Sequence, residues 1–417
     1  MNTPREIYAD HAATTAPAAE VIAAMEPCMG AAFGNPSSVH RRGEAAREAI
    51  DRARAQVAAL IGAMPEEIVF TATGSEANNL AIIGSLGGGL GVALGGASTV
   101  AARPAAVPPR RRIVVSAIEH PSVLETAHAL GDAGIEVTVV PVGSDGVLDE
   151  SRVARALGPD VALVSVMLVN NEIGTIQPVA GIAKLAKQAG ALMHCDAVQA
   201  VGKIPVDLGA LGVDLLTLAG HKFHGPLGAA ALYVRRRVRL APQVHGGHQE
   251  RSRRAGTENL PAIVGLGVAA QRAARALDTQ TPRTIASLGD RLLDGLLARV
   301  AGAHLNGARE RRVPGLVNVR FEGVDGEAVL HELDLQGITV STGSACSAAT
   351  PGPSHVLLAL GLGPEDAHAS VRFSLGEDND DTDVDRIITT TAAVVERLRA
   401  LGGRMPDGAE RVARAGA

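Results

Sequence analysis

Short runs of β-branched and other apolar residues alternate with helical segments from Ile68 onward, and this alternation limits the chain to few folds. The runs are IVF, RIVVSA, IEVTVV, VALVSVM, ALMHC, DLLTLA and AAALYV. Between them lie segments such as Ile182–Gln188, in which apolar residues recur at helical spacing. Repeated strand–helix–strand patterns are typical of an α/β domain with a mainly parallel central sheet. Such sheets bind ligands at the carboxyl ends of their strands, so we expect a site in the loops that follow these runs.

Helical patterns lie on both sides of this region. Before it, residues 41–62 carry apolar side chains on one helical face, and Gly62 ends the pattern. After it, the sequence predicts helices over residues 263–277 and 285–300, then two strands and a last helix with Thr382 as its N-cap. The segments after the sheet therefore indicate a second structural unit.

The fold class that follows is α/β, with a mainly parallel central sheet and a smaller α+β domain. With 417 residues, 46% of them apolar, the chain can bury two cores. We predict a large domain over residues 14–261, a small domain made of residues 1–13 and 262–402, and a frayed tail over residues 403–417.

Charge and cysteine content exclude several function classes. The net charge is −5 at pH 7, and the basic residues are dispersed apart from the runs Arg110–Arg112 and Arg235–Arg237. This argues against a nucleic-acid or anionic-membrane partner. Three cysteines, Cys28, Cys195 and Cys346, leave at least one thiol unpaired, and no secretory signal opens the chain. We therefore expect a cytoplasmic protein.

The uncharged stretch Ala77–Ala102 is long enough to span a bilayer, but its glycines make a membrane helix unfavourable. We interpret its beginning as the end of a helix that starts at Ser75. Residues 84–109 are interpreted as a loop rich in Gly, Ala and Pro.

Polar residues follow several predicted strands, and each has a structural as well as a functional interpretation. Gly74 and Ser75 in FTATGSEANN open a helix, where backbone N–H groups and a hydroxyl can face a phosphate, although many strand-to-helix turns look alike. His120 in SAIEHPSVL follows another strand, where a structural histidine is the simpler interpretation. Asn170 and Asn171 follow a third, where buried amides need partners.

Two further strand ends carry stronger chemical signals. Asp196 ends the strand in MHCDAVQAVGK, with Gln199 three residues later, although the carboxylate could serve only as a helix cap. Lys222 in LAGHKFHGPLG follows an apolar strand beside His221. Desolvation there would lower the pKa of the amine towards the range of a nucleophile or base.

The histidine pairs His221/His224 and His245/His248 raise the possibility of a metal site. No cysteine lies at ligand spacing, and neither segment has a helical pattern. We therefore expect no metal.

A phosphate-binding turn, a strand-end acid and a strand-end lysine on one parallel sheet are the parts that a pyridoxal 5′-phosphate (PLP) enzyme requires. The lysine attaches the cofactor, the acid keeps the pyridine nitrogen protonated, and the turn anchors the phosphate. The combination favours a PLP enzyme, which no single member of the set does.

The motifs in which these residues occur resemble those of the NifS/IscS type of cysteine desulfurase, within the class V aminotransferase family. The matching motifs are YADHAATT, GNPSSVH, SEANNLAI, VNNEIGTIQP, HCDAVQAVGK, GHKFHGPLGAAALYVRR, HGGHQERSRRAGTENLP, STGSACSAA and SVRFSLG. They cover nearly all of the chain except its tail and the Gly/Ala/Pro stretch. The resemblance implies the fold type I, aspartate aminotransferase-like architecture of PLP-dependent transferases.

The resemblance also implies roles around the cofactor ring. Lys222 would bind PLP covalently, and Asp196 would pair with the pyridine nitrogen. Gln199 would hydrogen-bond the 3′-oxygen of the ring, while His120 would stack on its face and shuttle a proton.

For the phosphate, the resemblance implies contacts from Gly74, Ser75 and His221. Thr257 would reach it from the neighbouring subunit of a homodimer. The chain departs from the family at Ala219, where a serine usually stands, so one hydroxyl contact to the phosphate is missing.

For the substrate, the resemblance implies that Asn171 and Arg372 hold the carboxylate of L-cysteine, with Asn171 also near the cofactor. Cys346, in a segment of small residues, would take the sulfur as a persulfide and release L-alanine. An iron–sulfur scaffold or a tRNA-thiolation protein would then accept it.

Other activities remain compatible with the sequence. A selenocysteine lyase would use a similar site, and an aminotransferase would not need Cys346. A non-catalytic assembly protein would not need the full set Lys222, Asp196 and Arg372.

Overall fold

The computed structural model describes residues 5–87, 110–342 and 352–402. The predicted tail, most of the Gly/Ala/Pro stretch and Cys346 lie outside these described residues. No helix within the described part of the chain is long and apolar enough to cross a membrane.

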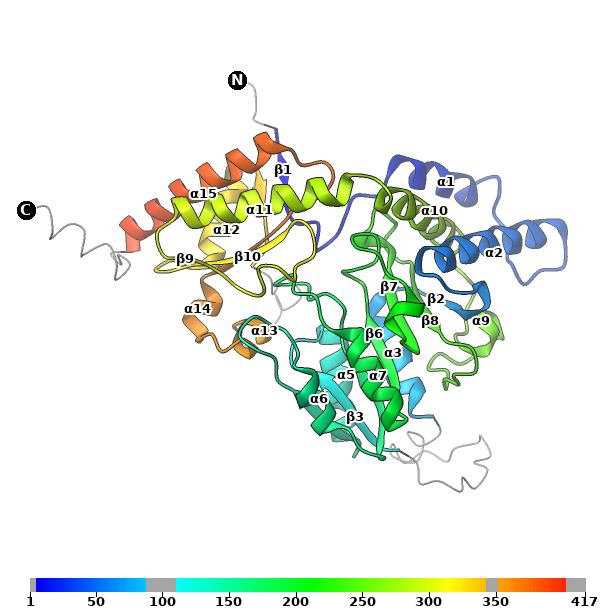
Figure 1. Cartoon of the computed structure of the whole chain (residues 1–417). Helices are drawn as coiled ribbons and strands as arrows, with labels where there is room; N and C mark the ends of the chain where they lie inside the picture. The colour runs from blue at the N-terminus through cyan, green and yellow to red at the C-terminus, as the bar shows by residue number, and fades with distance from the viewer. Residues whose placement is uncertain (1–4, 88–109, 343–351, 403–417) are drawn as a thin grey trace, which may run out of the picture.

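A seven-stranded sheet forms the centre of the larger part of the molecule (Figure 1). Its order is β2-β8-β7-β6-β5-β3-β4, and the strands are parallel except for β8, which is antiparallel to both neighbours. The strands are β2 Ile68–Thr71, β3 Arg112–Ser116, β4 Glu136–Val140, β5 Val161–Ser165, β6 Leu192–Asp196, β7 Leu215–Ala219 and β8 Ala230–Val234. Each coincides with an apolar run of the sequence, so the predicted fold class is confirmed.

The two faces of this sheet pack into separate hydrophobic cores because successive side chains of a strand point to opposite sides. In β3, Val114 belongs to one core, whereas Ile113 and Val115 belong to the other. The first core is covered by α1 Ala19–Met29, α2 Arg41–Ile61, α7 Val179–Ala189 and α10 Leu260–Leu277. The second is covered by α3 Gly74–Ser85 and α5 Pro121–Asp132.

The remaining elements of this part are short. They are η1 Pro65–Glu67, α6 Glu150–Ala156, α8 Leu208–Leu211, η2 Gly220–Lys222 and α9 Gln249–Ser252. The predicted helix over residues 41–62 is α2, which ends as expected at Gly62 in the left-handed conformation (φ 72°).

The smaller part of the molecule contains a three-stranded antiparallel sheet in the order β12-β10-β9. Its strands are β9 Ala303–Leu305, β10 Leu316–Phe321 and β12 Ser370–Ser374, and β1 Ile7–Tyr8 pairs in parallel with β11 Ile338–Thr339. The helices are α11 Thr281–Arg299, α12 Gly326–Leu335, α13 His355–Ala359, α14 Pro364–His368 and α15 Asp381–Gly402. In Figure 1, α11 and α15 lie side by side over this sheet, and Phe321 and Phe373 are buried in the core between them.

Two details differ from the sequence interpretation. Thr382 lies inside α15, and the amide of Asp383 donates to Asp380 Oδ1 at 2.9 Å, so an aspartate caps this helix instead. Helix α10 packs against α1 and α2. The division into two domains stays a proposal, but a boundary after α10 fits this packing better than one at residue 261.

Candidate active site

A cavity of about 460 Å³ opens at the carboxyl ends of the parallel strands. Its lining includes the predicted site residues Gly74, Ser75, His120, Asn171, Asp196, Gln199, His221, Lys222 and Arg372. Most of them follow strands of the central sheet, as the general rule for open α/β sheets predicts. Arg372 comes instead from β12 of the small sheet, and Ala12 and Ala13 come from the N-terminal segment.

Lys222 lies in η2, three residues after the end of β7. Its Nζ donates to the main-chain oxygens of Ala12 at 2.8 Å and Ala13 at 2.7 Å. The connection that carries the lysine is closed by a hydrogen bond from Gly220 N to Ala229 O at 3.0 Å. The β7–β8 hairpin and the N-terminal segment together therefore fix the direction of the Lys222 amine.

Asp196 is the last residue of β6 and its side chain is buried. Oδ1 accepts the amide of Val198 at 3.0 Å, which stabilises a turn and not a helix, because the next helix begins only at Leu208 and is capped by Asp207. The helix-capping role considered from the sequence is therefore wrong. Oδ2 accepts a hydrogen bond from Asn78 Nδ2 at 2.7 Å, and the same Nδ2 lies 2.9 Å from Ser122 Oγ. Because both oxygens accept hydrogen bonds, the carboxylate is held in place and can serve as the anionic partner of a ring nitrogen.

The N-terminus of α3 forms another wall of the cavity. Thr73 caps this helix by accepting the amide of Glu76 at 3.0 Å, and Gly74 and Ser75 follow in its first turn. A Cβ added at Gly74 would lie only 3.2 Å from Val198 Cγ2, so a side chain there would require Val198 to shift. A helix N-terminus directed into a cavity favours an anion such as phosphate.

His221 and Ala219 complete this wall. His221 Nδ1 lies 3.2 Å from Thr14 Oγ1. Burial, reinforced by the nearby Lys222 and Lys203, lowers the pKa of His221 to about 4. At neutral pH its ring is therefore uncharged, and it can donate one hydrogen bond to an anion.

His120 has a structural role and also a position on the cavity. Its Nδ1 accepts the amide of Ser122 at 3.1 Å and so caps α5, while its side chain also lines the cavity. Burial lowers the pKa of its imidazole, Asp196 works in the opposite direction, and Lys222 lowers it further. A neutral ring beside a cavity can accept a proton or pass one on.

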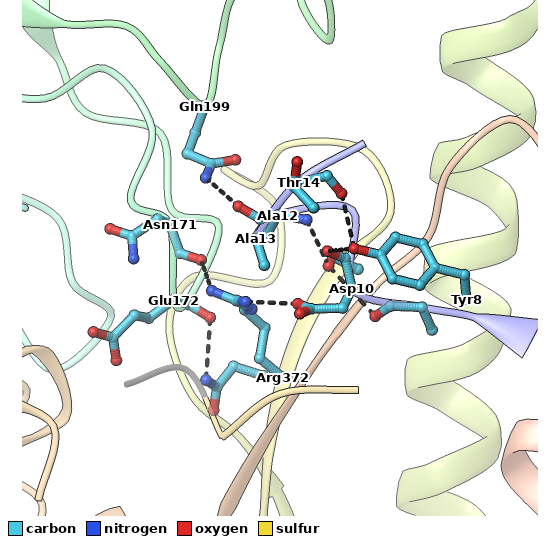
Figure 2. Close-up of polar contacts among 12 residues, drawn as sticks. Tyr8, Asp10, Ala12, Ala13, Thr14, Asn171, Glu172, Gln199 and Arg372 are labelled. Carbon is cyan, nitrogen blue, oxygen red and sulfur yellow. Dashed lines mark hydrogen bonds and ion pairs between the residues drawn. The ribbon is translucent and has the colours of Figure 1, made fainter. Parts of the chain in front are cut away.

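Arg372 connects the two parts of the molecule at the cavity (Figure 2). Its Nη1 donates to the main-chain oxygen of Asn171 at 2.9 Å, and its Nη2 forms an ion pair with Asp10 at 2.7 Å. The guanidinium Nε is buried and has no hydrogen-bond partner among the described residues. A buried donor without a partner is costly, and a ligand carboxylate would satisfy it.

Among the predicted site residues that the structure describes, one does not line this cavity. Thr257 lines a separate cavity of about 240 Å³ with Glu250 and Arg254. Cys346 lies outside the described residues, but Ser341 is paired with Arg372 through backbone hydrogen bonds of 3.1 and 2.6 Å.

On the other side of the Cys346 segment, the described chain resumes at Gly352. Ser354 Oγ donates to the buried carboxyl group of Glu172 at 2.5 Å, and His355 Nε2 lies 2.9 Å from the main-chain oxygen of Glu119. Burial raises the pKa of Glu172. The described residues that flank Cys346 are thus bonded to residues next to Asn171 and His120.

Sequence reasoning assigned no role to Asp10, Asn78 or Lys203. Asp10 orients Arg372 through an ion pair, and Asn78 orients Asp196 through a hydrogen bond. Asn78 also lines the cavity itself. The available signal was their position in the motifs YADHAATT, SEANNLAI and HCDAVQAVGK. Within the described residues, no group of three or more His, Cys, Asp or Glu side chains could hold a metal ion.

Residues 7–387 match the family model described as aminotransferase class-V. The chain belongs to the class-V aminotransferase family. It is 42% identical over 397 residues to a protein of Dictyoglomus turgidum described as cysteine desulfurase IscS, which covers 95% of this chain and 96% of that one. A solved structure described as a NifS-like protein has a TM-score of 0.84 and 33% identity, over 94% of this chain and 100% of that one.

A second solved structure, described as SspA in complex with cysteine, has a TM-score of 0.76 and 34% identity, over 89% of this chain and 99% of that one. This class-V aminotransferase is thus a PLP-dependent enzyme of the cysteine desulfurase type. The cavity fits that cofactor, because it combines an amine, a buried carboxylate and a helix N-terminus.

Proposed function

We propose that this enzyme removes the sulfur of L-cysteine, releases L-alanine and carries the sulfur as a persulfide on Cys346. The observation that supports this most directly is that Lys222, Asp196 and Arg372 line one cavity. The similarity to a structure described as a complex with cysteine supports the choice of substrate. Lys222, Asp196, Gln199 and the first turn of α3 would hold the cofactor.

The substrate carboxylate would be bound by Arg372 and Asn171. Arg372 can offer its buried Nε, while Asp10 and the main-chain oxygen of Asn171 keep its plane fixed. A planar guanidinium matches a carboxylate with two hydrogen bonds, which orients the Cα–H bond of the amino acid.

Lys222 is the group placed to move the Cα proton. The main-chain carbonyls of Ala12 and Ala13 direct its Nζ. His120 lines the same cavity, and its neutral imidazole can relay a proton. When PLP is bound, its ring supplies an acceptor for the electron pair left on Cα. The protein's task is then to remove and return protons at defined atoms.

The sulfur transfer is a displacement at the substrate sulfur. The Cys346 thiolate forms an S–S bond to that sulfur while the Cβ–S bond breaks, and the electron pair of that bond stays with the substrate carbon. Protonation of Cβ and Cα then gives L-alanine. No external oxidant is needed, because the carbon gains the electrons that the two sulfurs lose.

The other two thiols of the chain are poorly suited to this step. Cys195 is fully buried in β6 and burial raises its pKa well above that of a free thiol. Cys28 lies in α1 beside Pro27, and burial raises its pKa as well. A thiol with a raised pKa holds little thiolate at neutral pH, and thiolate is the reactive form.

The test is mass spectrometry of the enzyme after exposure to L-cysteine, together with an assay for alanine. We expect one additional sulfur on the peptide that contains Cys346, equal amounts of alanine, and no gain on the Cys28 peptide. Formation of a keto acid from cysteine, or alanine without any sulfur on Cys346, would favour the aminotransferase or a direct lyase.

The remaining parts of the proposal concern partners. The enzyme would act in the cytoplasm, as a homodimer, and donate sulfur to an iron–sulfur scaffold or a tRNA-thiolation protein. The homodimer rests on the resemblance, which assigns Thr257 to the neighbouring subunit, and it is compatible with Thr257 lining a cavity separate from that of Lys222.

Subunit complementation tests that arrangement. A mixed dimer of a Thr257→Ala chain and a Lys222→Ala chain would keep one complete site, because the first chain keeps its lysine and receives Thr257 from the second. We expect the mixed dimer to retain cofactor with higher affinity than the Thr257→Ala homodimer. Equal cofactor affinity in the two would mean that Thr257 does not cross between subunits.

A further inference from the structure

A second lysine, Lys203, lies close to the site and has no part in the steps described above. It follows Gly202, whose left-handed conformation (φ 80°) could not tolerate a side chain, because a Cβ would lie 2.5 Å from Phe223 Cβ. The turn therefore directs Lys203 towards Gln199, and Nζ donates to Gln199 Oε1 at 2.6 Å. Lys203 also lines a small cavity of about 70 Å³, which Lys222 lines as well.

This hydrogen bond determines which end of the Gln199 amide faces which partner. A lysine side chain has donors and no acceptor when charged, so the amide oxygen must turn towards it. Gln199 Nε2 then donates to the main-chain oxygen of Ala12 at 2.8 Å (Figure 2). In the reversed orientation, an N–H group would face the ammonium and the amide oxygen would face a carbonyl, so two attractive contacts would become repulsive.

The same carbonyl links Gln199 to the cofactor lysine. The oxygen of Ala12 accepts hydrogen bonds from Gln199 Nε2 at 2.8 Å and from Lys222 Nζ at 2.8 Å. An amide NH₂ group has two hydrogens, and only one is needed for Ala12. Since Gln199 lines the large cavity, its second N–H can donate to a ligand atom there.

The electrostatic surroundings of Lys203 are consistent with a structural role for its charged amine. Burial, followed by the charges of Lys222 and Arg372, lowers the pKa of Lys203 to about 7. Contacts must offset the cost of placing a lysine there, and the hydrogen bond of 2.6 Å to Gln199 Oε1 stabilises the charged amine. The charge of Lys203 also contributes to the lowered pKa of His221.

We propose that Lys203 is a positioning residue that holds the Gln199 amide with its N–H group towards the 3′-oxygen of the bound cofactor. The proposal rests on the proposed function, in which Gln199 contacts that oxygen. Lys203 touches neither cofactor nor substrate, and its effect passes through Gln199.

The test is the pH titration of the visible absorbance of the cofactor bound to Lys222, in the wild type and in Lys203→Met. Without an oriented donor from Gln199, the 3′-oxygen holds more strongly the proton that it shares with the nitrogen of Lys222. We expect the titration midpoint to rise by about 0.5 to 1 pH unit, the equivalent of one hydrogen bond. Lys184→Met, at an exposed position of α7, is the matched control and should leave the midpoint unchanged.

Two conservative variants separate orientation from charge and guard against a misfolded Lys203→Met protein. Lys203→Arg keeps a charged donor, and Lys203→Gln keeps a neutral donor that can bind Gln199 Oε1. We expect both to have midpoints closer to the wild type than that of Lys203→Met. A Lys203→Gln midpoint as far displaced as that of Lys203→Met would overturn the proposal, because the charge alone would then explain the effect.

A double-mutant cycle with Gln199→Ala shows whether the effect passes through the amide. In the Gln199→Ala background, Lys203→Met should produce no further shift of the midpoint. A shift of the same size in both backgrounds, or none in either, would disprove the role of Lys203. A wild-type protein that shows no lysine-bound cofactor absorbance at all would instead contradict the proposed function.

Discussion

The cavity has two walls that are built in different ways. One wall consists of strand ends and helix starts of the central sheet, with Gly74, His120, Asp196 and Lys222 each a few residues from a strand. The other is assembled from segments far apart in the chain, such as Asp10 and Arg372, which are 362 positions apart. The first wall carries the groups that would bind the cofactor, and the second carries the group that would bind the substrate.

This difference means that cofactor binding and substrate binding depend on different parts of the structure. The sheet wall is supported by a large hydrophobic core, so it can hold a cofactor whether or not substrate is present. The second wall depends on an ion pair between the N-terminal segment and β12. Changes in the first wall should therefore affect cofactor attachment, whereas changes in the second should affect substrate affinity.

The largest effect is expected in the sheet wall. Lys222→Ala should remove covalent cofactor attachment and turnover, because no other described lysine lies at the carboxyl end of a strand beside the N-terminus of α3. Borohydride reduction followed by peptide mapping checks this, with the exposed Lys187→Ala as the control. Cofactor reduced onto the Lys222→Ala chain at another position would contradict the assignment.

Cys346→Ser should lose alanine and sulfide production almost as completely, but for a different reason. A serine hydroxyl is far less acidic than a thiol, so it cannot attack the substrate sulfur. Cofactor attachment should be unchanged, and the visible spectrum should still respond to added L-cysteine. Full desulfuration by this variant, with Cys28→Ser as its control, would show that another group takes the sulfur.

Asp196→Asn separates cofactor attachment from cofactor activity within the sheet wall. Its amide could still accept a hydrogen bond, but it cannot keep a proton on a pyridine nitrogen, and the electron-accepting character of the ring depends on that proton. We expect a variant that retains cofactor and is nearly inactive. Cofactor content, from the visible spectrum, and alanine formation are measured on the same sample. Near-normal alanine formation would contradict the role of Asp196.

Asp10→Asn probes the second wall. Loss of the charge at 2.7 Å from Arg372 Nη2 loosens the guanidinium, so the KM for L-cysteine should rise about 5- to 10-fold, the equivalent of roughly 1 kcal/mol or slightly more. Cofactor content should stay at the wild-type level. A fall in KM would show that Asp10 competes with the substrate carboxylate and does not position its partner.

The smallest expected effect is a gain. Ala219→Ser places a hydroxyl on the cavity wall beside Gly74, so it should tighten cofactor binding by about 1 kcal/mol, or roughly 5-fold. Cofactor retention during dialysis measures this, and an Ala219→Val variant serves as a control for side-chain size alone. Unchanged or weaker retention in the serine variant would argue against a phosphate contact.

The sheet wall was largely predictable from the sequence because its residues are tied to local patterns. The strands were readable as apolar runs, and a residue that follows such a run must lie at a known edge of the sheet. Thus Asp196, Lys222 and the α3 turn were placed correctly before any tertiary information. Their proposed roles remain to be tested.

The second wall and the supporting contacts were not predictable in this way. No periodicity relates Asp10 to Arg372, and a chain can bring two such segments together only through its complete tertiary fold. Asn78 and Lys203 were missed because each is defined by a side-chain hydrogen bond, to Asp196 and to Gln199, and a sequence shows residues but not their partners. The cap of α15 was misassigned because several adjacent residues in DNDDTD can all cap a helix.

The antiparallel strand β8 has a consequence for how the enzyme is assembled. Lys222 lies on the link between β7 and β8, which are neighbours in both sequence and space, whereas the parallel strands of the sheet are joined by longer crossovers. Pairings between close segments cost little loop entropy and form early during folding. We therefore expect the hairpin that carries Lys222 to form in newly made chains before Arg372 packs against the cavity. The cofactor could then bind during folding, before the substrate-binding wall is complete.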